Sequence, residues 1–456
     1  MNTLFLLIIL IACLGVSFVL TGRRLISPVV FFFVPFIFQI LDGFLFYRIW
    51  EFNLHMETVA IVSGCFFVFA FGCVLVHHTL GSNNKIRYVS DRPVALSSAN
   101  AYNRPIHIPT RFYWLIIIVQ IILFLIVFRA EKQVVSQYLP VSGIADVITG
   151  YNNLNKFTDA DAILPTIPAQ LSAVLQGLTF FVALLGAKEL ANRGRSSSPV
   201  CMLALLVAIV VAFATGNRTW PLSVLFTFGI IYLLLLEKQG KITSIAKIKV
   251  KYIVFGIIAF VALLGAFYML TFAMGRDNTM TPIYYLSVYL GAPLKNLDSA
   301  IAESITPSPV PGEYTFNFLF QTLIAKFGVE ADQIVSLPYR DIGIYPLGNV
   351  YTVFFAPLKD FGIAGCLLLI FVLAIVMQAI YEISLRADDS RLSIAQVLYG
   401  YFSFLLAMTF FAHFIFQNVV HLGFAKQLVT IIAFTIFTNY IVRKRVVSEV
   451  IPIRVN

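Results

Sequence analysis

The residues best suited to chemistry lie between Arg340 and Gly365, where the sequence reads RDIGIYPLGNVYTVFFAPLKDFGIAG. The stretch brings one arginine, one lysine, two aspartates, one asparagine and two tyrosines to the start of an apolar run over 361–383. Such groups are costly at a bilayer boundary unless they face protein, water or a ligand. Their concentration at one boundary therefore indicates a functional site. The alternative is that tyrosine and lysine simply anchor a helix at the interface.

Three arginines could bind phosphate groups at one membrane face. Arg218 lies in the short connection Gly216–Thr219, Arg276 follows an apolar run over 252–273, and Arg340 opens the stretch described above. A guanidinium group matches phosphate oxygens with two parallel hydrogen bonds, which suits a pyrophosphate. The connection around Arg218 is too short to carry its charge far from the lipid boundary, where an uncompensated charge costs about 3 kcal/mol. The alternative is that each arginine extends to water on its own.

Several side chains at the same face are candidate general bases. Asp360 borders an apolar run, so it could accept a proton or simply place a favourable charge at a helix N-terminus. His413 and His421 flank a short apolar connection and are either a pair of bases or interface anchors. The other candidate carboxylates are Asp277, Glu313 and Asp341.

The chain lacks the motifs of several large enzyme classes. It has no GxxxxGK[ST], GxGxxG, HExxH or GxSxG, so NTP hydrolysis, hydride transfer, zinc proteolysis and serine hydrolysis have no visible site. Asp159 and Asp161 could hold the metal of a nucleotide-sugar transferase, but they lie in an external connection where nucleotide sugars are not supplied. We therefore expect neither a metal nor another cofactor.

Membrane helices must position these residues. The chain has 456 residues, 59% hydrophobic and only 12% charged, with a mean hydropathy of +0.89, whereas soluble domains carry about a quarter charged residues. We expect an all-α polytopic integral membrane protein with a single membrane domain over 1–456. Apolar runs of roughly 17 to 25 residues predict about eleven spans. They cover 3–20, 28–47, 58–77, 112–129, 166–187, 200–215, 219–236, 252–273, 361–383, 396–416 and 421–441.

Lysine and arginine cluster in alternate connections, which predicts an external N-terminus and a cytoplasmic C-terminus. The basic connection 78–111 is then cytoplasmic, whereas 130–165 and the long connection 274–348, which precedes the last three spans, are extracytoplasmic. Within the long connection, the tyrosine-rich piece 281–297 is too short and too broken by proline and glycine to span, so it predicts an interfacial or re-entrant helix.

Charge and cysteine usage exclude two further classes of protein. The net charge is +10, but the basic residues lie in short connections without interleaved aromatic residues, so nucleic-acid binding is not expected. The five cysteines all fall in apolar runs and lack CxxC spacing, so they are expected to be core residues rather than disulfide partners or metal ligands.

The stretch also resembles a family signature. Its polar and glycine residues are similar to the N-x-Y-T…D-F-G-x-x-G pattern of the O-antigen (oligosaccharide repeat-unit) polymerase family. The connection around Arg218 and the position of Arg276 resemble the two arginine turns of that family. The residues that carry the main pattern are Asn349, Tyr351, Thr352, Asp360, Phe361, Gly362 and Gly365.

This resemblance implies a glycosyltransferase of the GT-C type, which uses lipid-linked donors on the extracytoplasmic face of a bacterial inner (cytoplasmic) membrane. Such an enzyme moves a growing glycan from undecaprenyl pyrophosphate onto a new undecaprenyl-pyrophosphate-linked repeat unit, building O-antigen or capsule. Its partners are these lipid-linked oligosaccharides, membrane lipid and a polysaccharide chain-length regulator. Arg218 and Arg276 would stabilise the leaving pyrophosphate without a metal, and Asp360 would accept a proton. Arg340, Asn349, Tyr351 and Thr352 would complete the substrate-binding set.

Two alternatives stay open on the sequence alone. An O-antigen ligase has a similar architecture but passes the finished glycan to lipid A core. A lipid-linked oligosaccharide flippase or exporter would line a central cavity with charges and often has two related halves. The polar residues here gather at one face, which favours an enzyme.

Overall fold

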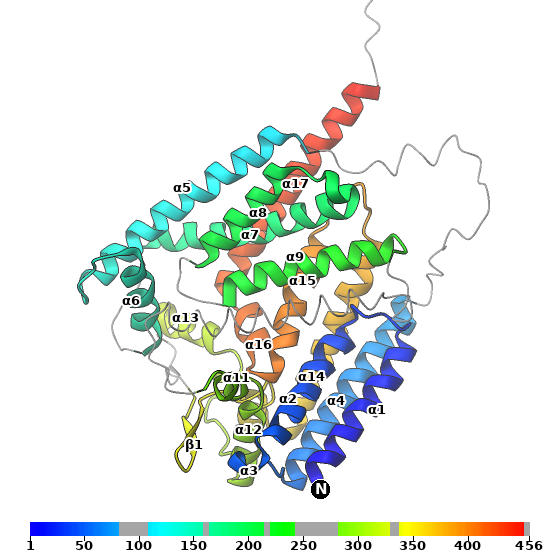
Figure 1. The fold of residues 1–456 in the computed structure, drawn as a ribbon, viewed down its shortest axis with the longest axis vertical. Coiled ribbons are helices and arrows are strands. Elements are labelled where there is room, and N and C mark those ends of the chain that lie inside the picture. The colour runs from blue at the N-terminus through cyan, green and yellow to red at the C-terminus, as the bar shows by residue number, and fades with distance from the viewer. Residues whose placement is uncertain (82–107, 158–163, 214–218, 242–280, 329–336, 451–456) are drawn as a thin grey trace, which may run out of the picture. The chain divides into compact units, whose positions relative to one another are not determined.

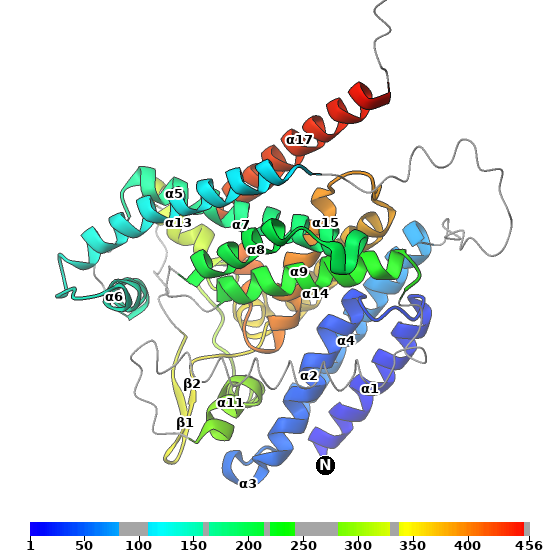
Figure 2. The ribbon, with the colours of Figure 1, turned by 45° about the horizontal axis from the view of Figure 1, so that its top comes forward.

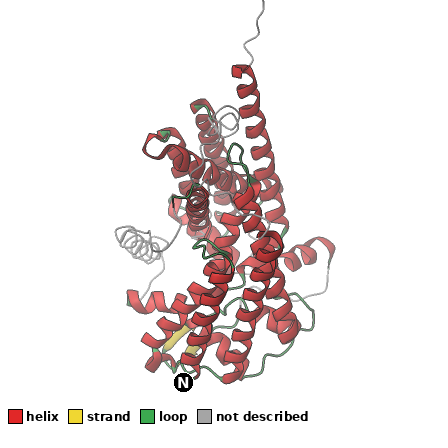
Figure 3. Cartoon of the chain, turned by 90° about the vertical axis from the view of Figure 1, so that its right-hand side faces the viewer, coloured by secondary structure: helices red, strands yellow, loops and turns green. Residues whose placement is uncertain are grey.

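The computed structural model describes residues 1–81, 108–157, 164–213, 219–241, 281–328 and 337–450. Most of these residues are helical, and the described regions also contain loops, turns and two short strands (Figure 3). Eight of the described helices are long and apolar enough to cross a membrane. The described regions are therefore those of an α-helical membrane protein. These eight helices are α1 (Asn2–Leu20), α2 (Pro28–Leu45), α4 (Met56–Val76, continued by a π-turn to Gly81), α5 (Thr110–Val135), α7 (Thr166–Arg193), α9 (Thr219–Lys238), α14 (Phe355–Arg386) and the Leu422–Val442 part of α17 (Leu422–Val450).

Two further predicted spans correspond to shorter apolar helices, α8 (Pro199–Ala212) and α15 (Ile394–Ala407). Helix α15 is continued by a 3-10 turn to Phe410, and the helical chain then breaks before α16, so the predicted continuous span 396–416 is wrong at its C-terminal end. The predicted span 252–273 lies outside the described residues, and the predicted number of spans stays a prediction. The remaining elements are α3 (Tyr47–Trp50), α6 (Ile144–Phe157), the 3-10 turn Gly194–Ser196, α11 (Pro282–Leu290), α12 (Ala292–Ala302), α13 (Asn317–Phe327), β1 (Arg340–Ile342), β2 (Tyr345–Gly348) and α16 (Phe414–Val419).

The contacts divide the chain into two compact units. The first unit comprises Met1–Asn83, Thr243–Ala379 and Phe402–Leu422; the second comprises Asn84–Ile242, Ile380–Tyr401 and Gly423–Asn456. This division does not test the predicted single membrane domain, which stays a prediction.

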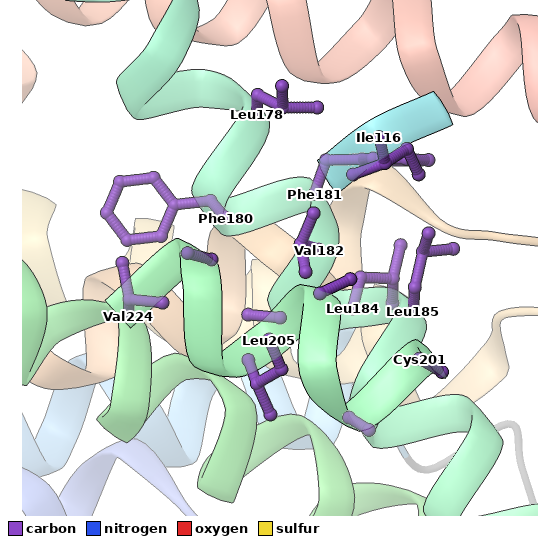
Figure 4. Packing of buried hydrophobic residues seen from close by; sticks show 14 of the residues in the cluster. Ile116, Leu178, Phe180, Phe181, Val182, Leu184, Leu185, Cys201, Leu205 and Val224 are labelled. Carbon is purple, nitrogen blue, oxygen red and sulfur yellow. The ribbon is translucent and has the colours of Figure 1, made fainter. Parts of the chain in front are cut away.

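In the second unit, α7 is the central helix. It is buried almost all round between Gly177 and Ala187, as expected for a uniformly apolar helix that contacts several neighbours. Gly186 allows a close approach, because a Cβ there would lie 3.3 Å from Leu205 of α8 and 3.5 Å from Phe228 of α9. Figure 4 shows this core, which includes Ile116 of α5, Leu178, Phe180, Phe181, Val182, Leu184 and Leu185 of α7, Cys201 and Leu205 of α8, and Val224 of α9.

In the first unit, α1, α2 and α4 lie side by side (Figures 1 and 2). Helix α14 contacts α4, where Cys65 Sγ lies 3.8 Å from Cys366 Sγ and a Cβ at Gly72 would lie 2.8 Å from the Cβ of Ala374. Small residues are typical of such close helix contacts in membranes. Both cysteines are free thiols.

The predicted interfacial or re-entrant piece 281–297 is helical, but it forms two helices, α11 and α12. Thr281 caps α11 by accepting the backbone N–H of Tyr284 at 3.4 Å. The chain breaks at Gly291, where a Cβ would lie 2.5 Å from the Asp42 carboxylate and 2.6 Å from the Trp50 ring. No side chain fits there, so the two helices meet α2 and α3 at a glycine.

Helix α14 contains a sharp reversal near its start. Gly362 has φ 65° and ψ −168°, a backbone conformation open essentially only to glycine. A straight helix would separate Phe354 from Cys366 by about 18 Å, yet Phe354 O lies 3.9 Å from Cys366 Sγ. A Cβ at Gly365 would lie 2.1 Å from the Cβ of Phe361. The segment 355–361 is therefore a short helix that turns back at Gly362 before the long part of α14 begins.

Candidate functional site

The stretch singled out in the sequence lies in the first unit, and α12 supports it. The fully buried Asn296 of α12 donates from Nδ2 to the carbonyl oxygens of Leu347, Gly348 and Val350 at 3.3, 3.4 and 2.9 Å. These bonds satisfy backbone acceptors that precede α14 and hold the segment around Asn349 in place.

A two-stranded hairpin, β1 and β2, precedes that segment. It is antiparallel, with Arg340 opposite Gly348 and Ile342 opposite Tyr345. Its tight turn contains Gly343 at φ 59°, a conformation that glycine adopts without steric cost. The hairpin was not predicted from the sequence.

Arg340 is held on three sides. Its terminal nitrogens Nη1 and Nη2 each donate to a different carboxylate oxygen of Glu303 at 2.6 Å, and its Nε donates to the Tyr351 hydroxyl at 3.0 Å. The hydrogen bond to Glu303 raises the pKa of Arg340, and the same bond lowers the pKa of Glu303. Glu303 is 64% exposed, so the pair itself adds little stability. The Glu303 carboxylate occupies the fork between the two terminal nitrogens of Arg340, in the way that two oxygens of a phosphate group would.

Tyr351 and Thr352 are buried and engaged within the chain. The Tyr351 hydroxyl donates to Pro338 O at 2.9 Å, its ring stacks on Phe355 at 4.4 Å between centroids, and burial raises its pKa. The Thr352 hydroxyl oxygen accepts the backbone N–H of Phe354 at 3.4 Å. Both residues therefore fix the path into α14, and their predicted contacts with substrate stay predictions, as does that of Asn349.

Asp360 clamps the loop before α13 onto the short first helix of α14. Its two carboxylate oxygens accept the backbone N–H groups of Tyr314 and Thr315 at 3.3 and 2.7 Å, and the residue is 8% exposed. The neighbouring Lys359 supports the same clamp, since its carbonyl oxygen accepts the N–H of Ser308 at 2.9 Å. Its ammonium also lies 4.8 Å from the centre of the Tyr314 ring. Asp360 thus has a structural task, which the sequence alone did not indicate, and its predicted role as a base stays a prediction.

Glu313 and His413 join Asp360 around the same loop. One Glu313 carboxylate oxygen accepts the Ser308 hydroxyl proton, and the residue is buried. His413 is also buried, and its Nε2 lies 3.0 Å from Tyr314 O. Because a carbonyl oxygen only accepts, this nitrogen carries the proton and donates. The structure therefore brings together three residues that were separate candidates in the sequence.

The break after α15 meets the segment before α14. The backbone N–H of Val353 donates to Thr409 O at 2.7 Å, and Gln39 of α2 donates from Nε2 to Phe410 O at 2.9 Å and to Leu290 O at 2.8 Å. Non-helical backbone is tolerated at membrane depth only where protein or a water-filled cavity satisfies it. Here the buried Gln39 and the Val353 amide supply those partners.

The remaining predicted residues fall elsewhere. Arg218, Arg276 and Asp277 lie outside the described residues, whereas Asp341 is exposed on the hairpin and His421 packs its ring 5.6 Å from that of Phe318. Within the described ranges, no group of three or more His, Cys, Asp or Glu residues could hold a metal ion. Asp159 and Asp161 lie outside those ranges.

Three polar residues on and next to α12 were not predicted from the sequence, namely Asn296, Asp298 and Glu303. For Asn296 and Asp298 the signal was a polar pattern, Lys295-Asn296-x-Asp298, inside a piece that is otherwise mostly apolar. Such groups are seldom buried unless they are partnered, so their presence there indicates a supporting role for the helix.

No family model, curated protein or solved structure matches this chain.

Proposed function

We propose that this protein is a glycosyltransferase that polymerises a bacterial surface polysaccharide from lipid-linked repeat units. The observation that carries the proposal is the fork of Arg340. Both terminal nitrogens lie 2.6 Å from oxygens of one anionic group, the geometry in which arginine binds a phosphate group. A pyrophosphate would replace the exposed Glu303 carboxylate at this fork.

The surrounding chain supports this use of the site. Four residues of the family-like pattern lie at the reversal in α14: the backbone requires glycine at Gly362 and Gly365, Gly365 approaches Phe361 closely, and Asp360 ties down the adjacent loop. By the distribution of basic residues, this end of the first unit faces the extracytoplasmic side of the inner membrane. Lipid-linked repeat units are available on that side.

In the proposed reaction, an acceptor sugar hydroxyl of one undecaprenyl-pyrophosphate-linked unit attacks the anomeric carbon of a second lipid-linked glycan. The bond from that carbon to the pyrophosphate oxygen breaks, and undecaprenyl pyrophosphate leaves with the electron pair. Arg340, together with Arg218 and Arg276, would stabilise the charge that develops on the leaving group, which is the task a metal performs in other transferases.

Deletion of the gene, followed by gel analysis of cell-surface glycan, separates the proposed function from its two rivals. Loss of a polymerase leaves lipid A core, or the corresponding capsule carrier, with a single repeat. Loss of a ligase leaves no attached repeat, and loss of a flippase leaves none and traps lipid-linked units inside the cell. Either of the last two patterns would overturn the proposal.

Purified protein provides the second test. Mixed with the undecaprenyl-linked lipid fraction extracted from the deletion strain, it should produce a ladder of longer glycans, in excess chelator as well as without it. Arg340→Gln should lower the rate while Glu303→Gln should not, because only the arginine would contact the pyrophosphate. A ladder from Arg340→Gln equal to that of the wild type would contradict the role of the fork.

A further inference from the structure

His55 and Asp298 form an ordered pair at the same end of the first unit. His55 lies directly before α4, and Asp298 is a fully buried residue of α12. One Asp298 oxygen accepts the backbone N–H of His55 at 2.8 Å, and the other lies 3.1 Å from His55 Nδ1. Two bonds to one carboxylate fix both the backbone and the ring, so the orientation of the imidazole is set by α12.

The chemistry of the partners decides where the ring carries its proton. Asp298 also pairs with Lys295 Nζ at 3.8 Å, and Lys295 in turn donates to Glu51 O at 3.1 Å. An ionised carboxylate only accepts, so the neutral imidazole holds its proton on Nδ1 and donates it to Asp298. The other nitrogen, Nε2, keeps its lone pair. The His55 side chain is 57% exposed, so more than half of the side-chain surface is open to solvent.

The same helix carries the partner of Arg340. Asp298 and Glu303 are five residues apart on and just after α12, about 7.5 Å along the helix axis. Figures 1 and 2 show α3, which leads into the His55 segment, and β1, which carries Arg340, at the end of the first unit where the N-terminus lies. Helix α12 therefore carries the partner of His55, which is Asp298, and is followed directly by the partner of Arg340, which is Glu303.

Three of the other candidates for a base, Asp360, Glu313 and His413, are less open than His55. Both oxygens of Asp360 accept backbone N–H groups, and Glu313 and His413 are buried beside it. A general base must reach the proton that it removes. Among these four side chains, His55 combines an oriented ring with a largely exposed side chain.

We propose that His55 Nε2 accepts the proton of the attacking sugar hydroxyl, with Asp298 as its positioning residue; this inference rests on the proposed glycosyl transfer. As the new bond from the acceptor oxygen to the anomeric carbon forms, the hydroxyl proton passes to Nε2. Undecaprenyl pyrophosphate leaves with the electron pair of the broken bond. The resulting imidazolium is stabilised by Asp298 in the manner of a histidine oriented by a buried aspartate. Of the titratable groups nearby, Asp298 contacts the ring and Lys295 of α12 pairs with Asp298, and Glu51 and Glu57 lie in the same segment as His55.

Replacement of His55 by asparagine removes the imidazole ring but keeps the structural role of this position at the start of α4. His55 precedes the first turn of α4, where asparagine is a favourable residue, and the bond from the backbone N–H to Asp298 does not need the side chain. His55→Asn should therefore keep the protein level of the wild type, with a thermal midpoint lowered only by the loss of one hydrogen bond to Asp298. The control is His78→Asn, which changes a histidine at the other end of the same helical segment.

The rate of glycan elongation is measured with the extracted undecaprenyl-linked lipid fraction across neutral pH. His55→Asn should lower kcat about 100-fold or more, with little change in KM, and should change the pH profile of the rate. Asp298→Asn should lower kcat at least about tenfold, because an amide can donate to Nδ1 and reverse the tautomer. His78→Asn should match the wild type in rate and in pH profile.

The outcomes separate the two proposals. If the wild type does not elongate the lipid-linked glycan at all, the proposed function fails. If the wild type elongates it and His55→Asn does so with the same rate and pH profile, only the role of His55 is overturned. A loss of rate in His55→Asn that follows a loss of folded protein, with specific activity unchanged, would likewise overturn it and leave His55 as an anchor of α4.

Discussion

Replacement of Gly365 by alanine tests the reversal at the start of α14 directly. The added Cβ would lie 2.1 Å from the Cβ of Phe361, whereas ordinary contacts begin near 3.4 Å, so the two segments must separate by about 1.3 Å. Both atoms are attached directly to backbone, and neither can rotate away. Overpacking of this kind costs about 1–3 kcal/mol, and we expect Gly365→Ala to lie at the upper end, near 3 kcal/mol.

The assay is thermal unfolding of purified protein in detergent, combined with the elongation rate per folded molecule. Gly365→Ala should lower the thermal midpoint and also the specific activity, because the displaced first helix carries Asp360. The matched control is Gly15→Ala in α1, where a Cβ would meet no described atom within 4 Å. Alanine there should be neutral or stabilising by up to about 1 kcal/mol.

A double variant adds a stricter test. Phe361→Gly removes the Cβ in conflict, so Gly365→Ala should cost at least about 1 kcal/mol less in that background than in the wild type. Gly365→Ala with an unchanged midpoint and unchanged activity would refute the reversal. If the two substitutions destabilised the protein additively, the specific contact between residues 361 and 365 would be refuted.

Three further predictions address the topology, the arginine turn and the Asp360 clamp. Ile344→Cys, at the hairpin turn where the native side chain is 87% exposed, should react with an impermeant thiol reagent in intact spheroplasts; labelling only after lysis would reverse the proposed topology. Arg218→Ala should lose about 3 kcal/mol of transition-state stabilisation, or a hundredfold in rate, and Arg218→Lys should recover little because a point charge cannot replace the fork; wild-type glycan ladders from Arg218→Lys would contradict this. Asp360→Asn replaces one acceptor oxygen by a donor opposite the N–H groups of Tyr314 and Thr315, so it should destabilise the protein by about 1–3 kcal/mol; an unchanged thermal midpoint would argue against the clamp.

The sequence by itself determined the class of the protein and the place of most helices. Long apolar runs have few ways to satisfy their backbone other than helices, which is why the predicted spans at 3–20, 28–47 and 58–77 correspond closely to α1, α2 and α4. The helical nature of 281–297 was also predictable from composition and length. These properties are local, since each depends on the residues of one segment.

The backbone needs of Gly362 and Gly365 were only partly visible in the sequence. The family-like pattern indicated that both glycines matter. The physical reason is that the chain turns back there, so that Cys366 lies next to Phe354. Likewise, the sequence marked Asp360 as a charge at a helix start, whereas the structure makes it the acceptor for N–H groups 45 and 46 residues earlier.

Only the tertiary structure decided which polar groups meet. Arg340 finds Glu303 across 37 residues, and His55 finds Asp298 across 243. Hydrophobic periodicity reports which side of a helix is apolar, but it carries no information on which buried donor will face which acceptor. That pairing follows from how α12 packs between the start of α4 and the segment before α14, because buried charged and polar groups are stable only where the fold provides each of them with a partner.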